Sequence, residues 1–130
     1  MENQTPYPWL EDYLLSLPGA EHDYKLEWQW DRYMIRGKMF AATMCPAQEH
    51  DPAYAGHPIT NLKCDPRRAE LLRAEFPFIL PGFYADKRTW ISVLLDSGCS
   101  EDLLRELCAD SHRLVLEKLP KYVQKEIARE

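Results

Sequence analysis

The chain has 130 residues, of which 45% are hydrophobic and 28% charged, with a formal net charge of -5 at pH 7. This length fits a single domain, and the apolar content suffices for a packed core, which excludes wholesale disorder. No apolar run approaches the roughly 18 residues of a membrane span, and the N-terminus lacks the features of a secretory signal. The acidic balance excludes a protein that coats nucleic acid through bulk charge. We therefore expect a cytoplasmic monomer without membrane contacts.

The first half of the chain is predicted to form a helix, short strands and a loop. Aromatic residues and leucines at helical spacing predict a helix over 6–17. Short alternating runs between 24 and 43 predict two or three antiparallel strands, with turns near Asp31 and Gly37. The segment 45–58 contains three prolines and has no periodicity, so it is predicted to be a loop.

The second half alternates strands and helices that have clear start and stop signals. Asp65 before a proline predicts a helix start, and Ser100 before two acidic residues predicts another. The predicted elements are a strand over 59–64, a helix over 65–75, an edge strand or turn over 78–83, a central strand over 89–95 and a helical face continuing from Ser100 to Leu119.

This order of elements predicts an α+β fold, in which a twisted antiparallel sheet is covered by helices on one face. We expect one domain over 1–130, with a core from about 6 to 119. Residues 120–130 are expected to form a charged C-terminal tail that is helical or irregular.

Seven short motifs occur in order between roughly residues 10 and 119. They are Pro18-Gly19-Ala20-Glu21, Gly37-Lys38-Met39-Phe40-Ala41, Leu62-Lys63-Cys64-Asp65-Pro66, Pro81-Gly82-Phe83-Tyr84, Lys87-Arg88-Thr89-Trp90, Leu95-Asp96 and Ser111-His112-Arg113-Leu114-Val115. Together they resemble the MmcQ/YjbR family of small bacterial proteins. The resemblance implies a CyaY-like (frataxin-like) double-wing architecture and, as the family is usually described, DNA binding. The chain departs from the family at Thr89, where a histidine is common, and at His112, where an aromatic residue is favoured.

The distribution of charge suggests where DNA would bind. Residues 25–95 carry ten bases and eight acids, whereas residues 1–24 carry five acids and no lysine or arginine. The best cluster of bases consists of Lys63, Arg67, Arg68, Lys87 and Arg88. We predict that these residues contact DNA phosphates weakly and in a salt-sensitive manner, without an element that reads bases. The alternative is ordinary solvated charge, paired with nearby carboxylates.

Signals for catalysis and metal binding are weak. The four histidines are scattered and no nucleophile, GxGxxG, Walker or HExxH pattern occurs, so we predict no enzyme, no catalytic residue and no cofactor. The four cysteines are expected to be reduced thiols. Cys45, His50, His57 and Cys64 offer zinc-binding atoms, but their spacings are longer than those of structural zinc sites, so no metal site is predicted.

A competing class of function is a non-enzymatic module that binds a protein, a small ligand or a metal on a frataxin-like fold. An unknown protein partner or a small ligand would contact the aromatic hairpin around Trp28 and Trp30, or the loop 45–58. The frataxin-like fold also implies a cation site at acidic residues of the first helix and the following strand. The corresponding residues here are Glu11, Asp12, Glu21 and Asp23.

Overall fold

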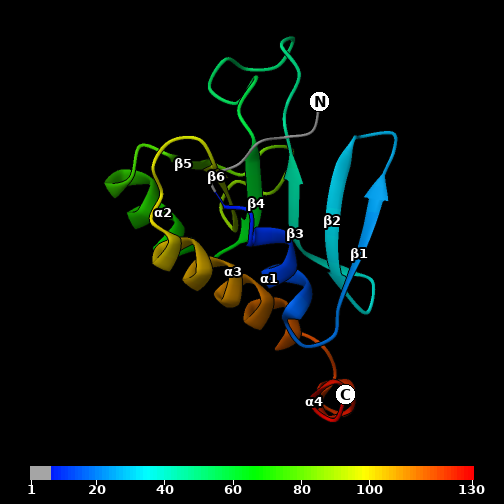
Figure 1. The fold of residues 1–130 in the computed structure, drawn as a ribbon. Coiled ribbons are helices and arrows are strands. Elements are labelled where there is room, and N and C mark those ends of the chain that lie inside the picture. The colour runs from blue at the N-terminus through cyan, green and yellow to red at the C-terminus, as the bar shows by residue number, and fades with distance from the viewer. Residues whose placement is uncertain (1–6) are drawn as a thin grey trace.

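The computed structural model describes residues 7–130, which form one six-stranded sheet and four helices (Figure 1). In chain order the elements are α1 (Leu10–Ser16), β1 (Ala20–Lys25), β2 (Trp30–Ile35), β3 (Lys38–Met44), β4 (Ile59–Lys63), α2 (Pro66–Glu75), β5 (Ile79–Pro81), β6 (Trp90–Leu94), α3 (Glu101–Leu116) and α4 (Lys121–Ala128). The strand order is β1-β2-β3-β4-β6-β5, and all neighbouring strands are antiparallel. The predicted α+β class with an antiparallel sheet is confirmed.

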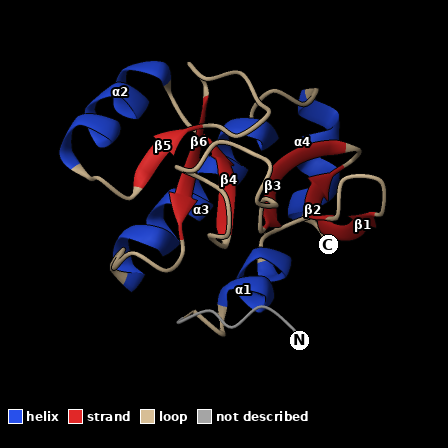
Figure 2. Cartoon of the chain, turned by 90° about the horizontal axis from the view of Figure 1, so that it is seen from above, coloured by secondary structure: helices blue, strands red, loops and turns tan. Residues whose placement is uncertain are grey.

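The main core lies between the helices and one face of the sheet, as predicted. Leu14 of α1, Leu104 of α3 and Ile127 of α4 belong to one buried cluster with Tyr33 and Ile91 of the sheet. Figure 2 shows α2 beside β5 and β6, at the opposite edge of the sheet from β1. Because side chains alternate along a strand, each central strand also presents residues to the other face.

This second face of the sheet is covered by loops. Its smaller buried cluster is centred on Trp30, Met44 and Phe83, and none of the members belongs to a helix. The predicted loop 45–58 is confirmed, and it contributes Tyr54 to this cluster. The face without helices is therefore where loops and hairpin turns form surface features.

The predicted turn near Asp31 is wrong. Asp31 lies inside β2 and pairs with Thr43 of β3, whereas the turn occupies residues 26–29. Trp30 is buried and holds the start of β2 in the sheet, and Gln29 before it adopts a left-handed conformation with φ of 60°. The turn was misplaced because β1 is a polar edge strand without alternating apolar residues, so the sequence did not predict a strand beginning at Ala20.

The predicted helix starts are confirmed by their caps. The Asp65 carboxylate accepts hydrogen bonds from the backbone N–H groups of Arg67 and Arg68, each at 3.2 Å. The Ser100 hydroxyl accepts one from Leu103 at 3.1 Å. The first helix is shorter than the predicted range 6–17, because it begins at Leu10 and ends at Ser16; residue 6 lies outside the described residues.

The C-terminal segment forms α4 and joins the main core. Ile127 is only 2% exposed and packs in the same cluster as α1 and α3, beyond the expected core range of 6–119. No helix in the described part of the chain has the length and apolar character that crossing a membrane requires.

Candidate functional site

The predicted basic residues lie mainly at one end of the sheet. Lys63 is the last residue of β4 and pairs in register with Trp90, the first residue of β6. Lys87 and Arg88 precede Trp90 in the connection between β5 and β6. Arg67 stands in the first turn of α2, a few residues after Lys63. Three segments of the chain thus bring these bases to one end of the sheet.

Hydrogen bonds hold these segments together. The backbone N–H of Cys64 donates to the carbonyl oxygen of Thr89 at 2.8 Å, which fixes the start of α2 beside the β5–β6 connection. The Lys87 ammonium donates to the carbonyl oxygen of Gly82 at 2.8 Å. The Lys63 ammonium lies 5.8 Å from the centroid of the Trp90 ring, within the range of a cation–π interaction. These contacts orient the two lysines without neutralising their charge.

Arg88 is the most open of the predicted bases. Its side chain is 85% exposed, and its Nε lies 3.8 Å from a carboxylate oxygen of Asp86. An ion pair this exposed contributes little to stability, so the guanidinium remains available to an anion from solution.

Arg68 points instead to α3. Its guanidinium donates hydrogen bonds to Asp110 and, at 2.5 Å, to Glu106. Burial lowers the pKa of this guanidinium, but the hydrogen bonds to the two carboxylates outweigh burial and hold its pKa above the ordinary value. We therefore assign Arg68 to the packing of α2 against α3, because two carboxylates already balance its charge.

Arg73 is a base that the sequence did not place in the site. Its guanidinium Nη1 donates to the carbonyl oxygen of Lys87 at 3.4 Å, so the last turn of α2 also reaches the β5–β6 connection. The sequence indicated that Arg73 faces outward, but only the fold shows which loop it meets. We call Lys63, Arg67, Arg73, Lys87 and Arg88 the basic surface.

The loop-covered face carries a separate feature, a pocket of about 550 Å³. The two regions named in the competing prediction, the aromatic hairpin and the loop 45–58, both line it, together with two aromatic residues of the β5–β6 connection. The lining residues are Glu27, Trp28, Gln29, Trp30, Met39, Met44, Cys45, Pro46, Ala47, Glu49, His50, Phe83 and Tyr84. We call this the aromatic pocket.

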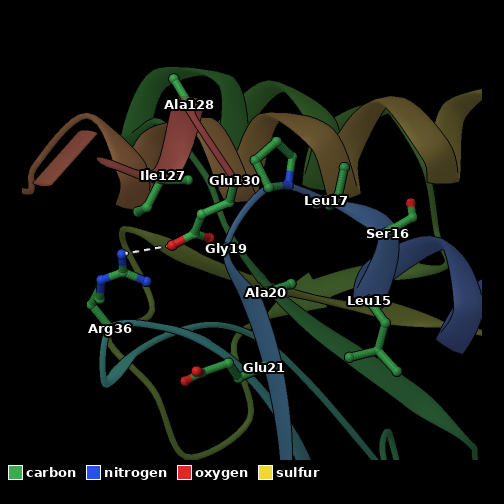
Figure 3. A pocket seen from close by; sticks show the side chains of 11 residues that line it. Leu15, Ser16, Leu17, Gly19, Ala20, Glu21, Arg36, Ile127, Ala128 and Glu130 are labelled. Carbon is green, nitrogen blue, oxygen red and sulfur yellow. Dashed lines mark hydrogen bonds and ion pairs between the residues drawn. The ribbon is translucent and has the colours of Figure 1, made fainter. Parts of the chain in front are cut away.

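A second pocket, of about 480 Å³, lies between α4 and the turn that follows α1 (Figure 3). The guanidinium of Arg36 lines it and donates to the Glu130 carboxylate at 2.9 Å, with Glu126 at 3.8 Å. Ile127 projects toward Gly19, whose φ of 74° disfavours any residue with a side chain and where a Cβ atom would lie 3.1 Å from Ile127 Cγ2. Since its one basic residue is already paired, we assign this region to the docking of α4.

The four residues considered as zinc ligands, Cys45, His50, His57 and Cys64, do not form a common site in the structure. Cys45 is exposed and Cys64 is buried, His57 pairs with Asp96 at 2.8 Å, and the His50 ring packs edge-on against Phe83. Burial raises the pKa of the Cys64 thiol, which disfavours the thiolate that a metal needs.

Of the four acidic residues implied by the frataxin-like fold, only Glu11 joins a group with metal-ligating geometry among residues 7–130. That group is Glu11, His22 and Asp31, whose ligand atoms lie within 4.8 Å of one another. His22 is hydrogen-bonded to Asp31 at 2.8 Å, and the Tyr33 hydroxyl donates to Glu11 at 3.2 Å. These bonds account for the positions of all three side chains.

Comparison with known proteins identifies the family. A family model described as YjbR matches residues 15–114, which is most of the chain. The chain belongs to the YjbR family. This confirms the resemblance drawn from the seven motifs.

Family relatives cover nearly the whole chain. Escherichia coli O157:H7 protein YbdF, described as uncharacterized, is 33% identical over 127 residues, covering 98% of each chain. YjbR of Escherichia coli K12, also described as uncharacterized, is 28% identical over 116 residues, covering 89% of this chain and 92% of its own.

Solved structures share the fold. Deinococcus radiodurans protein DR2400, with a domain called DUF419, has a TM-score of 0.77 and 27% identity, covering 95% of this chain and 88% of its own. A Pseudomonas syringae protein has a TM-score of 0.70 and 24% identity, covering 88% of this chain and 98% of its own. Membership of the YjbR family accounts for the architecture, whereas the function depends on the side chains of the basic surface and the aromatic pocket.

Proposed function

We propose that this YjbR-family protein binds DNA through phosphate contacts at the basic surface. The observation that supports this most is that three segments bring five bases to one end of the sheet. Among residues 7–130, Lys63, Arg67, Arg73 and Lys87 have no carboxylate within 4.0 Å, and Arg88 has only the exposed Asp86. Cations that no carboxylate neutralises are the groups that phosphates bind.

The overall charge of -5 is compatible with this proposal, because the acids concentrate elsewhere. β1, which carries Glu21 and Asp23, lies at the opposite edge of the sheet from β5, and α1, which contacts β1, carries Glu11 and Asp12. The field that a phosphate meets at the basic surface is dominated by the near charges, since salt screens charges beyond about 8 Å.

In this proposal the β5–β6 connection serves as the wing of the family's double-wing architecture that contacts DNA. The connection carries Lys87 and Arg88 to the DNA backbone. The protein acts as a cytoplasmic monomer, without catalysis or a cofactor, and its contacts are with phosphates rather than base edges. Binding is accordingly weak and independent of sequence.

The test is fluorescence anisotropy of labelled duplex and single-stranded oligonucleotides across a series of salt concentrations. Three to five phosphate contacts with duplex DNA predict that the logarithm of the binding constant falls with the logarithm of salt concentration, with a slope of about -2.7 to -4.5. The double variant Arg67→Glu/Arg88→Glu should abolish the signal at low salt. Both side chains are exposed and neither makes a core contact, so the fold should survive.

The matched control is Lys118→Glu/Lys121→Glu, which reverses an exposed lysine after α3 and another at the first position of α4. Both double variants change the net charge from -5 to -9, since each reversal adds -2. Loss of binding only in the first variant supports the basic surface. Equal loss in both, or no binding by the unaltered protein at low salt, would refute the proposal.

A further inference from the structure

We propose that the aromatic pocket binds a small organic cation whose charge is carried by an alkylated ammonium group. This site is separate from the basic surface and does not depend on DNA binding. The pocket volume of about 550 Å³ falls within the range of small-molecule sites. Its lining combines aromatic rings with carboxylates, and this combination decides the class of ligand.

The pocket has a buried aromatic base and exposed aromatic sides. Trp30 and Phe83 are each 6% exposed, with ring centroids 6.5 Å apart. Trp28 is 53% exposed and meets Trp30 edge-on at 5.2 Å, while Tyr84 is 73% exposed and stacks on Phe83 at 4.6 Å. Rings around one space present negative π faces, which attract a cation and exclude water from its alkyl groups.

The charges around the pocket select a positive ligand. Glu27 and Glu49 line it, whereas no lysine or arginine does. The Lys25 ammonium lies 3.9 Å from Glu27 and 5.3 Å from the Trp28 ring centroid, so this corner already holds a cation. Glu49 has no ion pair within residues 7–130, so its carboxylate is free to pair with a ligand. Arg32 also lies 5.8 Å from the Trp28 ring centroid, so the bases beside the pocket are confined to the Trp28 side, and a ligand at Glu49 and Tyr84 meets a carboxylate without a neighbouring base among the lining residues.

The site is held in shape before any ligand arrives. The Phe83 carbonyl oxygen accepts from the Asn61 amide at 2.8 Å, and the Phe83 N–H donates to the Ser92 hydroxyl at 2.9 Å. Tyr84 has φ of 51°, a left-handed conformation that costs a bulky residue of order 1–3 kcal/mol. These constraints direct the Tyr84 ring toward His50, whose ring lies edge-on at 5.6 Å. A preformed site loses less entropy on binding.

The probe is choline, and its control is 3,3-dimethylbutan-1-ol, which has the same shape with carbon in place of the charged nitrogen. Backbone amide NMR shifts and tryptophan fluorescence follow both titrations. Choline should give saturable shifts at Trp28, Glu49 and Tyr84, and the neutral alcohol should bind about tenfold more weakly, because it lacks the cation–π and carboxylate attraction of the charged nitrogen.

Variants separate the ring and carboxylate contributions. Glu49→Gln and Tyr84→Ala should each weaken choline binding by about two- to fivefold, the range for partly exposed charge and cation–π contacts. Glu70→Gln on α2 and Tyr122→Ala on α4 are matched controls at exposed positions, and they should leave binding unchanged.

Three results would overturn the proposal. They are equal binding of choline and the neutral alcohol, no saturable shift with choline, and equal effects of the pocket variants and their controls. Stronger shifts in the pocket with a thymidine oligonucleotide than with choline would assign the rings to base stacking instead. Loss of DNA binding in Arg67→Glu/Arg88→Glu should leave choline binding intact, so the two proposals fail independently.

Discussion

The buried side chain of Asn61 fixes the β5–β6 connection, which contributes residues to both the basic surface and the aromatic pocket. It lies in β4, fully buried, and its amide reaches across to the β5–β6 connection. The Ser92 hydroxyl donates to the Asn61 side-chain oxygen at 2.5 Å and accepts from Phe83. One network therefore fixes the connection that supplies Phe83 and Tyr84 to the aromatic pocket and Lys87 and Arg88 to the basic surface.

Asn61→Ala should lower the free energy of unfolding by about 1–3 kcal/mol, because it leaves buried partners without a hydrogen bond. The neighbouring Thr60 is also buried, but its hydroxyl has no hydrogen-bond partner among the described residues. Thr60→Val should therefore leave stability unchanged or raise it. Urea denaturation measures both changes. If the two variants had equal effects, the network would not be the source of the stability.

Single residues also mark where the sequence was informative. Asp65 and Ser100 predicted their helix starts because capping depends only on local neighbours. Arg68 looked like a member of the basic surface, but its two carboxylates lie on α3, about 40 residues later in the chain. Local signals fixed the backbone at these sites, whereas the pairing of charges depended on how the helices pack.

At the scale of elements, α4 is an integral part of the main core. The charged composition of residues 121–130 gave little sign of this, since one isoleucine carries the contact. Ile127 packs against the turn at Gly19, and Arg36 pairs with Glu126 and Glu130 on either side of it. The C-terminal helix thereby contacts both the turn between α1 and β1 and the turn between β2 and β3 (Figure 3).

Ile127→Ala should destabilise the protein by about 2 kcal/mol or more, as expected for a large-to-small change at a site that is 2% exposed. Tyr122→Ala in the same helix removes a side chain that is 68% exposed and should cost far less. Urea midpoints at neutral pH compare the two. An Ile127→Ala midpoint as high as that of Tyr122→Ala would show that α4 does not contribute to the core.

The strands illustrate what apolar periodicity can and cannot predict. β6 is apolar on both faces, and its predicted position inside the sheet is confirmed by its pairing with β4 and β5. β1 is a polar edge strand without apolar periodicity, so the sequence did not predict it and the turn that follows it was misplaced. The aromatic pocket was anticipated only in parts, because Phe83 joins the hairpin and the loop through long-range packing.

At the scale of the whole molecule, buried thiols make stability sensitive to alkaline pH. Burial raises the pKa of the Cys99 thiol to about 11 and that of Cys108 to about 12, from an ordinary value of 9.0. Above pH 9 the unfolded chain loses protons that the folded state retains, so the free energy of unfolding falls as pH rises. The stability is fully present below pH 9 and is lost as pH rises toward the folded pKa values.

Urea denaturation between pH 7 and 10.5 should therefore show a decline that begins near pH 9. Each fully buried thiol contributes at most about 1.4 kcal/mol per pH unit. Cys108→Ala should show a shallower decline than the unaltered protein, whatever its stability at pH 7. Parallel curves for the two proteins would contradict the assignment of this loss to the buried thiol.

The whole molecule presents two surfaces of opposite chemistry. The basic surface lies where β4 ends and β6 begins, whereas the aromatic pocket lies on the loop-covered face, lined by the β1–β2 turn, the loop 45–58, Phe83 and Tyr84. Phosphates and organic cations would thus bind at separate places. Membership of the YjbR family supplies the scaffold, and these side chains supply the chemistry.

The most direct test of DNA binding is an amide NMR titration of the full chain with a short unlabelled DNA duplex at low salt. Binding at the basic surface predicts progressive shifts at Lys63, Arg67, Arg73, Lys87 and Arg88, which added salt reverses, and unchanged amides in α1 and α4. Shifts centred on α1, α4 or the aromatic pocket, or no shifts at low salt, would contradict the proposed function.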